Sequence, residues 1–103
     1  MSPFYPSRLK EIHDLVKSMN YSIDNMLEII NLFKESLRIA KKVSPHIKKN
    51  HCLQSLSNTR YSEYIDLISK DNDNEIDRKI AFNEFKTAFR MDLEMNCFNN
   101  STP

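Results

Sequence analysis

The chain contains no glycine in its 103 residues, and this absence constrains the fold more than any motif does. Glycine supplies positive backbone angles and close backbone approach at little steric cost. Primed hairpin turns, phosphate-binding loops and dinucleotide fingerprints depend on those properties. Valine occurs only twice, whereas lysine, glutamate, leucine, isoleucine and methionine are frequent. We therefore expect an all-α fold without nucleotide-binding loops.

Apolar residues at helical spacing predict two helices in the first half of the chain. The first begins with Ser7 as its cap and ends near Asn20, and the second begins after a cap at Ser22. The predicted buried stripe of the second helix consists of Ile23, Met26, Leu27, Ile30, Phe33, Leu37 and Ala40. The Val43-Ser44-Pro45 sequence predicts a break, because the residue before a proline is disfavoured in the helical region.

Two further helices are predicted in the second half. One spans residues 45–70, with the polar stretch 57–59 as a point of kinking or division, and the last spans 74–98. The inward stripe expected for the last helix is Ile76, Ile80, Ala81, Phe85, Ala88 and Phe89. Together these patterns predict a bundle of four mostly antiparallel helices, or five if the third is divided. We expect one helical domain over 1–98 and a flexible tail over 99–103.

The cysteine pattern and the N-terminal segment predict an intracellular protein, cytoplasmic or nuclear and not secreted. Cys52 and Cys97 lie far apart without CxxC spacing, which is unlike a disulfide framework or a zinc site, so we interpret both as free thiols. The N-terminus lacks a basic stretch followed by an apolar run, and no window approaches the roughly 18 apolar residues of a membrane span. We expect no membrane association and no cofactor.

The acidic stretch SKDNDNEIDRKIAFNEF, residues 69–85, partly fits the pattern of an EF-hand calcium loop. A loop starting at Ser69 places Ile80 at position twelve, where a glutamate is required. A loop starting at Asp73 places Arg78 at position six, where glycine is required. Capping of the last helix by Asn72 or Asp73 explains the same residues without a metal. A degenerate calcium site is therefore our third functional hypothesis, and we assign no metal ligand.

A basic turn lies between the second and third predicted helices and contains no acidic residue. Its cations are Arg38, Lys41, Lys42, Lys48 and Lys49. Such a cluster can contact phosphates or an acidic protein surface, or it can be a solvated helix end where cations favour the negative end of the helix dipole. No aromatic residue interleaves these cations, and no arginine occupies a base-reading position of a recognition helix.

Catalytic chemistry is not indicated by any arrangement of side chains in the sequence. His51 and Cys52 are adjacent, and adjacent residues project roughly 100° apart on a helix, so they do not form a nucleophile–base pair there. We find no carboxylate pair, triad or oxyanion-binding loop. The sequence therefore predicts no catalytic residue, no enzymatic activity and no small-molecule substrate.

Methionine and phenylalanine residues lie outside the predicted inward stripe of the last helix. They are Phe82, Met91, Met95 and Phe98. Adaptable methionine suits docking surfaces, so our leading hypothesis is a small adaptor or regulator that docks another protein, or a second copy of itself, through this face with help from the basic turn. An N-terminal arm containing Phe4 and Tyr5 covering the same face is the alternative explanation. The rival function is a nucleic-acid-binding accessory protein that uses Arg38–Lys49.

Overall fold

A computed structural model shows four α-helices that pack as a bundle, which confirms the all-α prediction. It describes residues 7–47, 55–70 and 74–98, excluding the side chains of 43–47, 55 and 96–98. The helices are α1 (Ser7–Ser18), α2 (Ile23–Ile47), α3 (Ser55–Ser69) and α4 (Glu75–Asp92), and a π-helical segment η1 (Leu93–Phe98) continues α4. The predicted tail, 99–103, lies outside the described residues.

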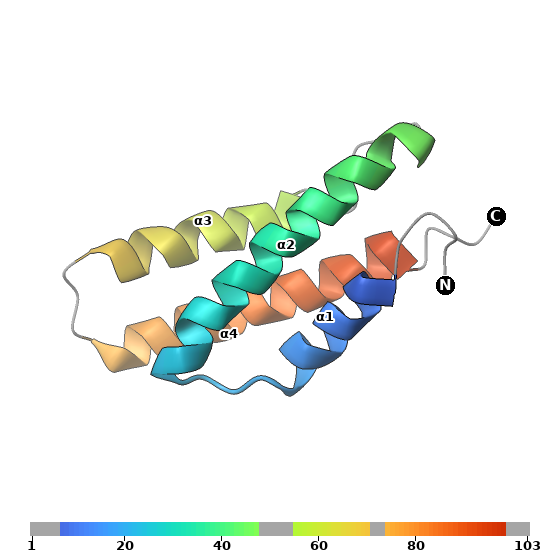
Figure 1. The fold of residues 1–103 in the computed structure, drawn as a ribbon. Coiled ribbons are helices and arrows are strands. Elements are labelled where there is room, and N and C mark those ends of the chain that lie inside the picture. The colour runs from blue at the N-terminus through green and yellow to red at the C-terminus, as the bar shows by residue number, and fades with distance from the viewer. Residues whose placement is uncertain (1–6, 48–54, 71–73, 99–103) are drawn as a thin grey trace.

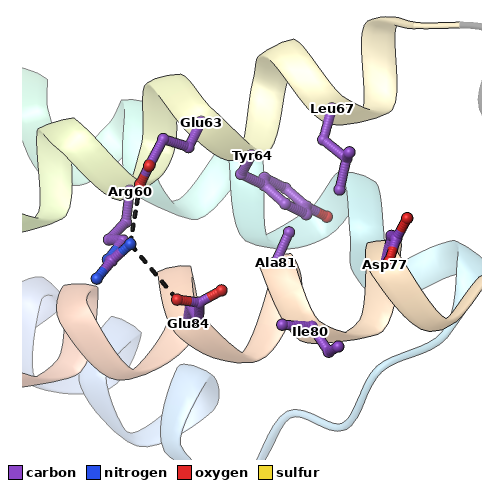
Figure 2. Close-up of a pocket in the computed structure, with 8 residues that line it drawn as sticks. All are labelled: Arg60, Glu63, Tyr64, Leu67, Asp77, Ile80, Ala81 and Glu84. Atoms are coloured by element: carbon purple, nitrogen blue, oxygen red, sulfur yellow. Dashed lines mark hydrogen bonds and ion pairs between the residues drawn. The ribbon is translucent and has the colours of Figure 1, made fainter.

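The helices form two layers, and consecutive helices run in opposite directions (Figure 1). Helices α3 and α4 form an antiparallel pair, and α2 crosses one face of that pair diagonally. Helix α1 packs against both α2 and α4. Because α1 and α2 lie on the same side, no helix of the described chain covers the opposite face of the α3–α4 pair (Figures 1 and 2).

Aromatic rings from α2, α3 and α4 form the centre of the core. The ring of Phe33 on α2 lies 5.0 Å from both Phe85 and Phe89 on α4, measured between centroids. Tyr64 on α3 stacks on Phe85 at 5.4 Å. Such pairs add to the stabilisation from buried apolar area. The remaining buried hydrophobic residues of the cluster are Leu9, Ile12, Val16, Met19, Ile29, Ile30, Leu32, Ala40, Phe82 and Leu93.

Capping explains where two of the helices begin. The Asn25 N–H donates to Ser22 Oγ at 3.0 Å, which confirms Ser22 as the cap of α2. The cap of α4 is Asn74, not Asn72 or Asp73 as predicted. Its side-chain oxygen accepts from the N–H groups of Ile76 and Asp77 at 3.0 and 3.3 Å. Asn74 has the extended backbone that lets its oxygen reach both donors.

The predicted break at Pro45 is wrong, because α2 continues to Ile47. A proline removes one backbone hydrogen bond and strains the preceding turn. Pro45 lies in the last turn of α2, so this penalty affects only the helix end, while burial of Ala40 and the residues before it fixes the rest. The third helix therefore does not begin at Pro45 as predicted. Helix α3 continues without interruption through residues 57–59, where a kink or division was predicted.

The buried face of α4 differs from the predicted one. Ile76 and Ile80, which were expected to face inward, are exposed, whereas Phe82 is fully buried. A stripe made of Phe82, Phe85 and Phe89 buries more apolar area than one built on the two isoleucines, so the aromatic stripe faces the core. In α2, Ile23 and Leu27 are likewise exposed instead of buried.

Polar contacts fix α1 relative to the other helices. The guanidinium of Arg8 donates to both carboxylate oxygens of Glu35 on α2, at 2.7 and 3.0 Å. The ammonium of Lys86 on α4 donates to the Met19 carbonyl at 2.6 Å, just after α1 ends. Among the described helices, none combines the length and the apolarity that crossing a membrane requires.

Candidate functional site

A groove runs between α3 and α4 on the face of this helix pair that α2 leaves uncovered. It consists of two hollows of about 270 and 440 Å³. Both hollows are lined by Arg60 of α3 and by Ile80 and Glu84 of α4, so they adjoin each other. We call this feature the α3–α4 groove.

The larger hollow is mainly apolar. Leu56 and Met91 line one end, and Ile80 lines the other, with Ala88, Asn83 and Thr87 between them. The exposed fractions of the three large apolar residues are 41% for Leu56, 37% for Met91 and 52% for Ile80. Each of these side chains keeps part of its apolar surface in water although it lies beside the others, which is the arrangement expected of a contact surface.

The smaller hollow is ringed by charged groups (Figure 2). Arg60 lies between two carboxylates: its Nη1 atom is 3.0 Å from Glu63 on the same helix and 3.4 Å from Glu84 on α4. Asp77 lies at the other end of this hollow, opposite Leu67 of α3. The buried Tyr64 and the small Ala81 form the base between the two helices.

A second apolar stripe on α4 produces the groove. Ile76, Ile80, Met91 and Met95 follow a helical repeat with Glu84 and Thr87, whereas Phe82, Phe85 and Phe89 follow another. At 3.6 residues per turn, the two stripes are separated by roughly 150° around the helix axis. The aromatic stripe packs on the core, so the second stripe is left on the outer surface.

The predicted docking residues are divided between these two stripes. Met91 lines the groove, and Met95 is exposed beyond it in the π-helical segment. Phe82 is wrong as a docking residue, because it is fully buried and its ring packs against Tyr21 and Tyr64. The side chain of Phe98 lies outside the described residues, as do Phe4 and Tyr5 of the N-terminal arm.

Only three of the five cations of the basic turn lie within the described residues. Arg38, Lys41 and Lys42 are exposed near the C-terminal end of α2. Lys48 and Lys49 fall in the segment 48–54, which lies outside the described residues, as do His51 and Cys52.

The structure contradicts one of the two alignments of the EF-hand calcium loop with this sequence. A loop starting at Asp73 needs a sharp turn at position six, which is Arg78, and this residue is helical in α4. The register starting at Ser69 includes 71–73, which lie outside the described residues. In the part of the chain that is described, no group of three or more His, Cys, Asp or Glu residues is placed to hold a metal ion.

A separate polar cluster joins α1 to the π-helical segment. His13 is buried, and its Nε2 atom lies 2.7 Å from Glu94 Oε2, while Nδ1 lies 3.1 Å from Asp14 Oδ1. The hydrogen bond with His13 lowers the pKa of the Glu94 carboxyl, and it also lowers the pKa of Asp14. Both ring nitrogens are engaged by carboxylates, and this geometry favours a structural link between α1 and η1.

Most residues of the groove were not predicted from the sequence. Ile80 was expected in the core, and Leu56, Arg60, Glu63 and Glu84 were not predicted as site residues. The repeat of Ile76, Ile80, Met91 and Met95 was the available signal, because its phase differs from that of the phenylalanines. No such signal exists for Arg60, whose position depends on how α3 packs against α4.

In comparisons with known proteins, no protein-family model, no curated protein and no solved structure matches this chain.

Proposed function

We propose that this chain is a small, non-enzymatic interaction module that binds another protein in the α3–α4 groove. The observation that supports the proposal is a partly apolar groove, made of two adjoining hollows, on the face of the α3–α4 pair that no described helix covers. The leading hypothesis from the sequence placed docking on α4. The proposal keeps that helix but replaces Phe82 with Ile80 and Leu56.

Energetics support the apolar hollow as the anchor point. Fully burying an aliphatic side chain is worth about 1.5–3 kcal/mol relative to leaving it in water. Leu56, Ile80 and Met91 are 37–52% exposed in the free chain, so a partner side chain seated among them would remove further apolar surface from water. Methionine also adapts its shape to the occupant, which suits Met91 to this position.

The groove fits a partner of limited size. Its α4 side extends from Asp77 to Met91, and a rise of 1.5 Å per residue makes this roughly 21 Å. A segment of that length buries less than the standard interface of about 1,600 Å², so the interaction belongs to the transient class. The basic turn is not part of this proposal, because two of its five cations lie outside the described residues.

Site-specific photo-crosslinking in the native host tests the proposal. A photoreactive amino acid is placed at Thr87, which lines the groove, or at Lys34, which is exposed on α2. We expect discrete protein adducts from position 87 that disappear when Ile80→Asp is added, and no matching adducts from position 34. Identical adducts from both positions, or adducts that survive Ile80→Asp, would contradict the proposal.

Two further measurements with purified protein separate the possible partners. Sedimentation of the wild-type chain and of Ile80→Asp identifies a second copy as the occupant if only the variant is monomeric. Binding to a random DNA duplex that collapses between roughly 50 and 200 mM salt would favour the nucleic-acid hypothesis instead. That result would need to persist in Ile80→Asp, because Arg38, Lys41 and Lys42 of the basic turn lie on α2 and not in the groove.

A further inference from the structure

We infer that the occupant of the α3–α4 groove is an amphipathic helix with apolar anchors at one end and lysine or arginine residues at the other. This inference rests on the proposed function and specifies the chemistry of its partner. It follows from the distribution of apolar and charged groups along the groove and from the groove's length.

The groove separates apolar from charged lining along the axis of α4. Leu56, Ala88 and Met91 line only the hollow at the Met91 end, and Glu63 and Asp77 line only the hollow at the Asp77 end. Arg60 and Glu84 line both hollows and lie between the two ends. A complementary helix must therefore change character along its length, with apolar side chains over about two turns and cations over the next two. A helix of about 14 residues covers the whole distance.

The net charge of the groove lining determines which sign of charge a partner should carry. Three carboxylates and one guanidinium line the two hollows, giving a net charge of −2. Arg60 lies within 3.4 Å of Glu63 and Glu84, so its charge is already matched. Asp77 lies away from Arg60 at the other end of the smaller hollow (Figure 2). A cation of the partner beside Asp77 gains attraction, whereas an acidic partner or a nucleic-acid phosphate meets repulsion.

The two antiparallel helices α3 and α4 also provide a shape that fits a helical partner. The space between two packed helices accepts the ridge of a third, and side chains spaced at i, i+3, i+4 and i+7 supply that ridge. Neither a flat sheet edge nor an extended peptide finds exposed strand edges to pair with in the described part of this chain, which is helical. A helix is therefore the occupant that the groove accommodates.

Two synthetic peptides test this inference on the intact protein. Each is a 16-residue, N-acetylated and C-amidated helix of about four turns, with leucines in its first half and four charged residues in its second. The charged residues are lysines in one peptide and glutamates in its twin. Binding is measured by fluorescence anisotropy, and amide chemical shifts of the ¹⁵N-labelled protein show where the peptide binds.

We expect the lysine peptide to shift amides of residues 56–67 and 77–91 and to bind with a dissociation constant of roughly 10–100 μM. The glutamate twin should bind at least about 10-fold more weakly, and raising the salt should reduce this difference, because screening weakens exposed charge pairs. Ile80→Asp should abolish binding of both peptides.

Two double variants, each with two carboxylates neutralised, test which carboxylates cause the difference in binding between the two peptides. The groove variant carries Glu63→Gln and Asp77→Asn, and the control carries Glu28→Gln and Asp24→Asn. Both pairs remove two exposed carboxylates, and in each pair the aspartate lies in the first turn of its helix, so effects on the helix dipole are alike. Discrimination between the two peptides should fall to less than about 3-fold in the groove variant and persist in the control.

The outcomes separate this inference from the proposed function. Equal binding of both peptides at the groove amides, or equal loss of discrimination in the two variants, would overturn the charge argument and leave groove docking standing. Failure of both peptides to shift groove amides would overturn the helical occupant. The crosslinks from Thr87 would then show independently whether the groove binds a protein at all.

Discussion

The guanidinium of Arg60 on α3 lies 3.4 Å from the carboxylate of Glu84 on α4, and both residues line the two hollows of the groove. The pair is partly exposed, with 39% and 50% of the two side chains accessible to solvent. Exposed ion pairs contribute about 0–1 kcal/mol to stability. The pair therefore shapes the groove without supporting the fold, and variants at Arg60 can be read as effects on binding.

Replacing Arg60 with methionine should leave the fold intact and strengthen binding of a basic partner. The apolar stem of the side chain is kept, so the free energy of unfolding in urea should change by less than about 1 kcal/mol. The lining then carries three carboxylates and no cation, so the lysine peptide should bind more tightly. Weaker binding of that peptide, with unfolding unchanged, would show that Arg60 itself contacts the partner.

Truncating Phe82 should mainly lower stability, whereas truncating Met91 should mainly weaken partner binding. Phe82→Ala leaves a cavity in the core and should lower the free energy of unfolding by about 3–5 kcal/mol. Met91→Ala removes a partly exposed side chain and should cost less than about 1 kcal/mol, while weakening partner binding. Urea denaturation of both variants checks the difference, and similar losses would mean that the two stripes of α4 are wrongly assigned.

Removing the Glu94 carboxylate should change how stability depends on pH. Its pKa is lowered in the folded state, chiefly by the hydrogen bond with His13. Its stabilising contribution is therefore present above the usual glutamate pKa of about 4.3 and is lost as the pH falls through the lowered value. The difference in unfolding free energy between wild type and Glu94→Gln should be at most about 1 kcal/mol near neutral pH.

That difference should shrink as the pH falls below the usual glutamate pKa of about 4.3. Urea denaturation across this range measures it, and Glu28→Gln, an exposed glutamate on α2, serves as the control. A difference that grew on acidification would contradict the assigned hydrogen bond.

The phenol of Tyr64 should be important for stability through one hydrogen bond. Its O–H donates to the Met26 carbonyl at 2.7 Å in the core between α3 and α2. Tyr64→Phe keeps the ring but leaves that carbonyl without this donor, which should cost about 1–2 kcal/mol.

The buried phenol of Tyr64 should also make stability depend on pH above the usual tyrosine pKa. Burial raises the pKa of the Tyr64 phenol, so it stays protonated in the folded chain when an unfolded tyrosine, with a pKa of about 10, already ionises. Wild-type stability should consequently fall as the pH rises above about 10, and it should fall less steeply in Tyr64→Phe. Ultraviolet titration of the phenols, with and without denaturant, measures the effect.

Asn74→Ala should destabilise the start of α4. The side chain of Asn74 accepts from two backbone N–H groups, and losing such a cap costs about 1 kcal/mol. Asn74→Asp should retain most of this energy. Amide hydrogen exchange in residues 75–78 would show the loss locally, whereas unchanged protection in Asn74→Ala would mean that the cap contributes nothing.

Several features of this protein could be predicted from the sequence because neighbouring residues determine them. The absence of glycine and the helical spacing of apolar residues predict helices, and Ser22 predicts where α2 begins. Hydrogen bonds within a helix and at its cap join residues three or four positions apart, so the information lies in a short stretch of chain. Even so, Pro45 shows that a local preference does not fix where a helix ends.

Only the tertiary structure decided which stripe of α4 is buried and where the groove lies. The stripe of Ile76 and Ile80 and the stripe of Phe82 and Phe85 share the helical period and differ only in phase, so periodicity does not choose which of the two faces is buried. The choice depends on the aromatic packing of Phe33 and Tyr64, which come from other helices. Burial energy is summed over contacts between distant segments, and the groove exists because α2 covers one face of the α3–α4 pair and leaves the other in solvent.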